Sequence, residues 1–149
     1  MSLYQVQLRV RRALKALFKH DWALLDGDAS ERAIAARLAS HLEPLFPGYN
    51  VDVEYNRHGL DPKAVELGAT CRGGGKKLIV PDVIVHHRRN DDNNLLVIEM
   101  KKETNSESRE CDRAKIVAMK RELNYQYGLI IDLPAGAGAE QREYLEEWF

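Results

Sequence analysis

The chain has 149 residues, of which 44% are hydrophobic and 30% charged, a composition typical of a globular protein with one core. Its apolar runs are far too short to span a bilayer, so we expect no membrane partner, and its net charge of −1 gives no sign of a broadly basic nucleic-acid-binding surface. We therefore expect a single domain over residues 1–149.

The N-terminal segment predicts an amphipathic helix over residues 3–19, because apolar residues recur every three or four positions from Leu3 to Leu17. This stripe could face the core or a second copy of the chain in a homodimer. The polar face carries five Lys and Arg side chains and would form either a basic surface or an ordinary solvated face. Arginines also interrupt any signal-peptide core, so we expect a cytoplasmic protein.

A second helix is predicted to start at Ser30, a favourable N-cap residue followed by Glu31 in the first turn, and to end before Pro47. The alternating segment 51–55 then predicts a half-buried strand. We expect no helix between these two helices.

A long excursion is expected over residues 57–77, ending in three glycines followed by Lys76 and Lys77. These residues do not form a phosphate-binding P-loop, because no Ser or Thr follows the first lysine. A flexible hairpin connection is predicted instead, and the two lysines are candidates for contact with a substrate backbone. The cysteines, Cys71 and Cys111, favour free thiols over a disulfide.

Two apolar runs further along the chain have charged residues at their ends. Asp82 opens the run 82–85 after Pro81, and Glu99 and Lys101 close the run that starts at Leu95. Both runs predict buried strands, where charge is costly unless it is paired or bound to metal. Because side chains alternate along a strand, Glu99 and Lys101 share one face. An ordinary turn residue and a surface ion pair are the alternative interpretation.

The remaining segments predict a helix over 109–123, a buried strand over 127–133 and a short acidic helix over 139–149. The whole chain therefore predicts an α/β (α+β) fold with a mixed central sheet flanked by helices, preceded by the extra N-terminal helix.

The pattern Pro81-Asp82 … Glu99-Met100-Lys101 resembles the PD-(D/E)xK nuclease superfamily, and the expected order of elements from about residue 30 to residue 132 is similar to that family's αβββαβ core. The resemblance implies a restriction-endonuclease-like fold and a metal-dependent nuclease, with nucleic acid, DNA rather than RNA, as its partner. It implies Mg²⁺ or Mn²⁺ held by Asp82, Glu99 and the Met100 carbonyl, with Lys101 beside the reacting phosphate.

Three further residues are weaker candidates. Glu31 matches the family's acidic residue on the helix before the sheet by order alone, and it could equally be a helix-dipole acid. Glu54 could face the same cleft or solvent. Lys115 shares a helix face with Asp112, and the two could line a substrate groove or form a surface ion pair.

Two other functional classes compete with a nuclease. The chain could be a catalytically inactive nuclease fold that binds nucleic acid, or a protein-interaction module that uses its oppositely charged terminal segments. A complete trio of Asp82, Glu99 and Lys101 favours the enzyme. A zinc site is not expected, because the cysteines lack metal-ligand spacing and adjacent histidines at 86 and 87 point to opposite strand faces.

Overall fold

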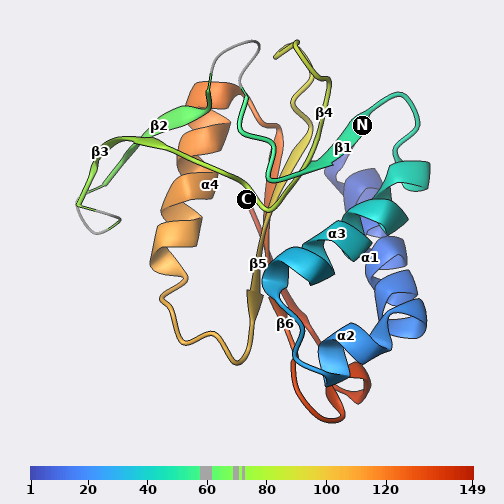
Figure 1. Cartoon of the computed structure of the whole chain (residues 1–149). Coiled ribbons are helices and arrows are strands. Elements are labelled where there is room, and N and C mark those ends of the chain that lie inside the picture. Colours follow the sequence, from blue (N-terminus) through green and yellow to red (C-terminus); the bar gives the residue numbers. More distant parts are fainter. Residues whose placement is uncertain (58–61, 69–70, 72) are drawn as a thin grey trace.

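In the computed structural model, a five-stranded mixed sheet lies between two layers of helices (Figure 1). The structure describes residues 1–57, 62–68, 71 and 73–149. The sheet has the order β1-β4-β5-β6-β7, in which β5 and β6 run parallel and the other neighbours antiparallel. Its strands are β1 (Asn50–Val53), β4 (Val83–His86), β5 (Leu96–Lys102), β6 (Tyr127–Leu133) and β7 (Leu145–Trp148).

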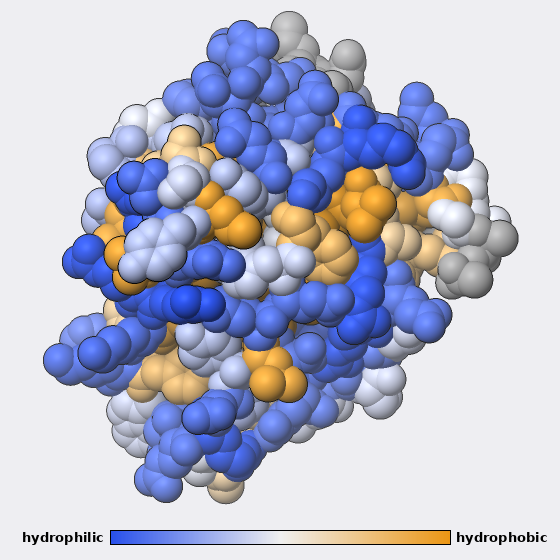
Figure 2. Space-filling model, turned by 180° about the vertical axis from the view of Figure 1, so that it is seen from behind, coloured by the Kyte–Doolittle hydropathy of each residue, from blue (hydrophilic) through white to orange (hydrophobic). Residues whose placement is uncertain are grey.

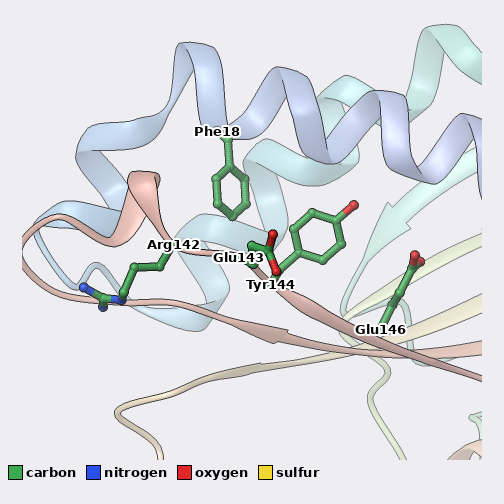
Figure 3. A pocket seen from close by; sticks show the side chains of 5 residues that line it. All are labelled: Phe18, Arg142, Glu143, Tyr144 and Glu146. Carbon is green, nitrogen blue, oxygen red and sulfur yellow. The ribbon is translucent and has the colours of Figure 1, made fainter.

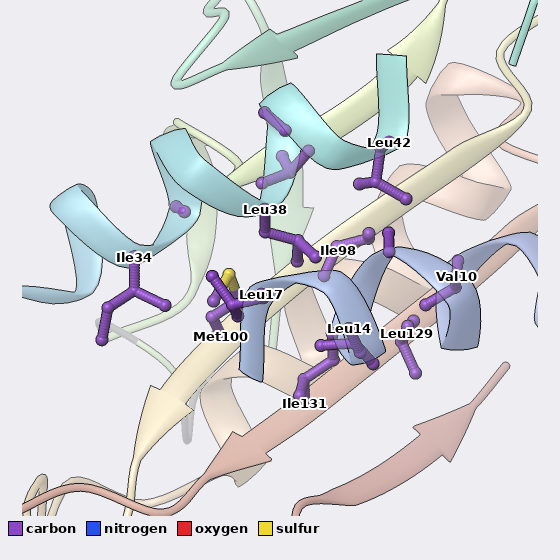
Figure 4. Close-up of a cluster of buried hydrophobic side chains, with 14 of the residues drawn as sticks. Val10, Leu14, Leu17, Ile34, Leu38, Leu42, Ile98, Met100, Leu129 and Ile131 are labelled. Carbon is purple, nitrogen blue, oxygen red and sulfur yellow. The ribbon is translucent and has the colours of Figure 1, made fainter. Parts of the chain in front are cut away.

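One face of the sheet is covered by α1 (Leu3–His20), α2 (Trp22–Asp26) and α3 (Glu31–Leu42), followed by the short 3₁₀ turn η1 (Glu43–Leu45). Figure 4 shows the apolar side chains of α1 and α3 meeting those of β5 and β6. The predicted stripe of α1 is buried in this core from Val6 to Leu17, whereas Leu3 at the start of the helix is exposed, so most of the stripe faces the core of its own chain. Burying one such Leu or Val side chain contributes about 1.5–3 kcal/mol.

The opposite face is covered by α4 (Glu110–Leu123) and by a separate hairpin of β2 (Ala64–Leu67) and β3 (Gly75–Leu78). The predicted excursion over 57–77 contains this hairpin, and its residues 58–61, 69–70 and 72 lie outside the described part of the chain. The glycine–lysine segment, expected to be a flexible connection, is itself strand β3 from Gly75 onward.

The prediction of free thiols is wrong, because Cys71 and Cys111 form a disulfide that joins the β2–β3 connection to the first turn of α4. Their Cα atoms lie 4.9 Å apart, within the range that a disulfide spans. The spacing of 40 residues gives no hint of this pair; packing of the hairpin against α4 brings the two residues together.

The C-terminal prediction is also wrong. In place of an acidic helix, residues 139–149 form the 3₁₀ turn η2 (Ala139–Gln141) and the strand β7. The edge of β6 would otherwise leave its backbone groups unpaired, and β7 supplies main-chain hydrogen bonds that outweigh the helix propensity of a polar segment. The pairing continues at Gly128 and Phe149, whose backbones exchange hydrogen bonds of 2.9 and 3.1 Å.

The other elements agree with the predicted order of helices and strands within a few residues, apart from α2, which the sequence did not indicate. Within the described ranges, no helix has the length and apolarity needed to cross a membrane. On the face shown in Figure 2, hydrophobic side chains form several separate patches within a largely hydrophilic surface.

Candidate functional site

The predicted motif residues meet at one hollow of about 480 Å³, which Asp82, Glu99 and Lys101 line together with Glu31. The strand pairing explains this meeting. Val83 of β4 lies opposite Ile98 of β5, and the strands are antiparallel, so the residue before Val83 lies beside Glu99. Lys101 follows on the same face of β5 two residues later.

Asp82 is held against the backbone of β5, where its Oδ2 accepts a hydrogen bond of 2.7 Å from the Met100 N–H. The N–H and C=O of one residue point to the same side of a strand, so the Met100 carbonyl also faces the Asp82 side. Burial raises the pKa of Asp82, and the Met100 N–H opposes this effect only in part. The backbone thus orients Asp82 without using both of its oxygens.

Glu99 is buried, with 3% of its surface exposed. Its Oε2 accepts a hydrogen bond of 2.9 Å from the Lys115 ammonium, whereas its Oε1 has no hydrogen-bond partner among the residues that the structure describes. Burial, with the neighbouring Asp82 carboxylate, raises the pKa of Glu99 to about 8 despite the Lys115 charge. A buried carboxylate oxygen without a donor is costly, and a bound cation is one way to offset that cost.

Lys101 lies at the same hollow between carboxylates from α4 and the loop before it. Its Nζ is 3.2 Å from Glu107 Oε2 and 3.6 Å from Asp112 Oδ2. Burial lowers the pKa of Lys101, but Asp112, Glu107 and Glu31 outweigh this effect and leave the pKa above its ordinary value. The ammonium therefore stays protonated at neutral pH.

Glu31 reaches the hollow from the first turn of α3, on the other side of the sheet. Its Oε1 accepts a hydrogen bond of 2.7 Å from the Asn105 side chain and a longer one of 3.5 Å from the Lys102 N–H. Both α3 and the end of β5 thus place Glu31 beside the motif, as expected from the order of elements.

Glu54 is placed elsewhere. It follows β1 and forms an ion pair with Arg32 of α3 at the surface, and it is not among the residues that line the hollow. Lys76 and Lys77 lie on β3 and also contribute nothing to its lining. The structure therefore separates these three predicted residues from the motif.

Lys115 does line the hollow, together with Asp112, one turn earlier on α4. Both side chains are buried, with 7% and 5% of their surfaces exposed, so they are not the surface ion pair considered from the sequence. The sequence left a substrate groove and a surface ion pair open for this pair, and only Lys115 was a candidate site residue. The three-residue spacing of two opposite charges was the available signal, but it does not tell whether the shared face points inward.

The donor atoms at this hollow suit a hard divalent cation. Within the described part of the chain, no hydrogen bond is found to one oxygen each of Asp82 and Glu99, and the Met100 carbonyl faces the same side. Within the described ranges, no three His, Cys, Asp or Glu side chains form a ready-made cage. Mg²⁺ commonly binds through one or two carboxylates and retains several waters, and Asp82 and Glu99 are the carboxylates here that could hold it.

A second hollow, of about 410 Å³, lies between α1 and the segment that leads into β7 (Figure 3). The Phe18 and Tyr144 rings face one another there at 5.7 Å, with Arg142, Glu143 and Glu146 around them. It contains none of the predicted site residues, and its paired aromatic rings indicate packing of the C-terminal segment on α1.

Comparison with known proteins adds no assignment: no protein-family model, curated protein or solved structure matches this chain. The case for a function therefore depends on the geometry of the first hollow.

Proposed function

We propose that this protein is a metal-dependent nuclease that hydrolyses phosphodiester bonds in nucleic acid, with DNA as the favoured substrate. The observation that carries the proposal is the convergence of Asp82, Glu99 and Lys101, from two adjacent strands, on one hollow in which a buried Glu99 oxygen has no hydrogen-bond partner. Two carboxylates and an ammonium are the groups that metal-assisted hydrolysis of a phosphate diester requires.

The topology supports a restriction-endonuclease-like core. Helix α3, strands β1, β4 and β5, helix α4 and strand β6 follow one another in the αβββαβ order of the resemblance, with the β2–β3 hairpin inserted between β1 and β4. In this arrangement the motif residues occupy the start of β4 and the end of β5.

Asp82, Glu99 and the Met100 carbonyl would hold Mg²⁺ or Mn²⁺. The bound ion would supply a water of lowered pKa and withdraw charge from the phosphate. Lys101 would place its ammonium against the non-bridging phosphate oxygens, where negative charge develops during attack. Because its pKa is raised, Lys101 acts as a positive charge and not as a base. Glu31 lies close enough to orient a water at the same hollow.

The deciding experiment is a cleavage assay with supercoiled plasmid, linear duplex, single-stranded DNA and RNA, each with Mg²⁺, Mn²⁺ or EDTA. The Glu99→Ala variant is the test, and Glu110→Ala, which removes an exposed carboxylate from the start of α4, is the matched control. We expect cleavage of DNA that disappears with EDTA and in Glu99→Ala but persists in Glu110→Ala.

Two other results of this assay would contradict the proposal. Binding of DNA without cleavage under any metal condition would replace the nuclease with a binding module of the same fold. Cleavage that persists in Glu99→Ala would point to a contaminating enzyme or another site. Because binding through phosphates weakens steeply with salt, the assays are run at one fixed, low ionic strength.

A further inference from the structure

Two charged side chains reach the hollow from helix α4, outside the predicted motif. Asp112 and Lys115 are three residues apart, so they share one face of the helix, and that face points at the end of β5. Both are buried. A buried ion pair is weak evidence for a stabilising role, because well-packed apolar residues often serve stability equally well. Their charges therefore call for another explanation.

Each of the two side chains faces the residue of opposite charge in the β5 motif. Lys115 Nζ lies 2.9 Å from Glu99 Oε2, and Asp112 Oδ2 lies 3.6 Å from Lys101 Nζ. The helix pair is itself linked, with Lys115 Nζ 3.8 Å from Asp112 Oδ1. The four groups thus form a chain of alternating charge: Glu99, Lys115, Asp112 and Lys101.

This chain determines which atoms of the motif remain free. Lys115 occupies one oxygen of Glu99 and leaves Oε1 without a hydrogen-bond partner in the described ranges of the chain. Asp112 lies between the two ammonium groups and attracts both, which keeps Lys101 at the hollow. Lys101 also donates a hydrogen bond of 3.2 Å to Glu107, whose side chain is 76% exposed, whereas Asp112 is buried and so acts through a less screened charge.

We infer that Asp112 and Lys115 are positioning residues of the active site. Lys115 turns Glu99 so that Oε1 is presented to the cation, and Asp112 holds the Lys101 ammonium where the phosphate binds. This inference rests on the proposed nuclease function and extends it to a second pair of residues on α4. Groups that orient metal ligands in this way typically change metal affinity or activity by about 10- to 100-fold when they are replaced.

The Lys115 part is tested by metal binding without nucleic acid. Calorimetric titration of Lys115→Met with Mn²⁺ should show an affinity at least about tenfold below that of the wild type. Lys115→Arg, which keeps a donor for Glu99, should recover most of the loss. Arg113→Met is the matched control, because Arg113 is an exposed cation on the same helix that pairs with Glu147. If Lys115→Met does not fold, Lys115→Gln is titrated instead: its neutral amide can still donate to Glu99, so an Mn²⁺ affinity within a few-fold of the wild type supports the positioning role and a loss of about tenfold or more overturns it.

The Asp112 part is tested by steady-state cleavage. Asp112→Asn should lower kcat by about 10- to 100-fold while KM and Mn²⁺ affinity remain close to the wild-type values, and Asp112→Glu should restore part of kcat. Glu110→Gln removes the same charge from the same turn of α4 at an exposed position and should leave kcat unchanged. A general loss of structure would instead lower metal affinity and the unfolding temperature together.

The outcomes separate this inference from the proposed function. A wild type that binds Mn²⁺ and cleaves DNA, with Lys115→Met and Asp112→Asn indistinguishable from it, overturns the positioning pair alone. A wild type that binds Mn²⁺ but cleaves nothing refutes the nuclease, and the positioning of Glu99 is then decided by the Lys115 titration. A wild type that neither binds Mn²⁺ nor cleaves any substrate refutes both.

Discussion

Two carboxylates beside strand β4 differ in how completely they are hydrogen-bonded: the half-buried Asp52, which contacts His86 at the far end of β4, and the buried Glu99, which lies beside Asp82 at its start. At the far end, Asp52 of β1 accepts hydrogen bonds of 2.8 Å from His86 Nε2 and from Arg88 Nε, and Arg88 also bonds its second oxygen. At the near end, beside Asp82, Glu99 has a donor for one oxygen only.

The pKa values of the two carboxyl groups follow this difference. Burial alone would raise the pKa of Asp52, but the hydrogen bonds from Arg88 and His86 outweigh it and lower the pKa. Burial dominates at Glu99 and raises its pKa to about 8. A fully paired buried carboxylate supports the fold, whereas an incompletely paired one costs stability and is expected where a ligand binds.

The largest expected effect lies at the Glu99 end. Lys101→Ala removes the positive charge that would face the phosphate, so cleavage should fall by about 10²- to 10³-fold or more. Mn²⁺ affinity, measured by calorimetry, should remain within a few-fold of the wild type, because Asp82 and Glu99 are unchanged. Turnover of Lys101→Ala at the wild-type rate would remove Lys101 from the mechanism. It would also weaken the case that the Glu99 end of β4 is functional while the Asp52 end is structural.

The disulfide offers a second test, because it fastens α4, beside Glu99, to the hairpin and leaves the Asp52 end without a covalent link. It closes a loop of about 40 residues, so reduction should lower the free energy of unfolding by about 4 kcal/mol. Chemical denaturation with and without dithiothreitol measures this difference.

The control for that experiment is Cys71→Ser, whose stability should not respond to dithiothreitol. Equal unfolding free energies for the oxidised and reduced wild type would show that the crosslink contributes nothing to stability.

The third prediction concerns the paired carboxylate. Asp52→Asn leaves the buried His86 and the Arg88 guanidinium without their charged acceptor, so the free energy of unfolding should fall by about 1–3 kcal/mol. Cleavage activity should be unchanged, because Asp52 does not line the hollow. Asp92→Asn, at an exposed position in the neighbouring turn, is the control and should change stability by less than about 0.5 kcal/mol. If Asp52→Asn lost activity but not stability, Asp52 would have a functional role and not the structural role expected here.

The fourth prediction uses pH. Because the pKa of Glu99 is raised from 4.5 to about 8 in the folded protein, the native state holds its proton over a range in which the unfolded chain has lost it. The metal-free protein should therefore lose stability as pH rises from 4.5 to about 8. Glu99→Gln cannot titrate and should lack this contribution.

Denaturation of both proteins at pH 5 and pH 8 gives the measurement. The stability advantage of Glu99→Gln should grow by at least about 1.4 kcal/mol between the two pH values, the equivalent of one pKa unit. Asp52 contributes in the opposite sense: its lowered pKa gives stability that is lost only as pH falls below about 4. If the stability difference between Glu99→Gln and the wild type is the same at both pH values, the pKa of Glu99 is not raised in the folded protein.

Much of the fold followed from local patterns. The three- and four-residue spacing of α1 predicted an amphipathic helix, and the apolar runs after Asp82 and before Glu99 predicted two buried strands with charged ends. Those predictions held because helix and strand periodicity depend on neighbouring residues in the chain. The C-terminal helix failed for the same reason: whether residues 145–148 form a strand depends on the open edge of β6 and not on their own preference.

The sequence alone therefore determined which residues carry the motif, since the alternation of side chains puts Glu99 and Lys101 on one strand face. Tertiary structure decided their partners. Antiparallel pairing of β4 with β5 placed Asp82 beside Glu99, and packing of α4 on the sheet buried Lys115 and Asp112 against the motif. The same packing joined Cys71 to Cys111 and left Glu54 outside. The physical reason is that charge pairing and crosslinking depend on distances in space between segments far apart in the chain, which periodicity does not encode.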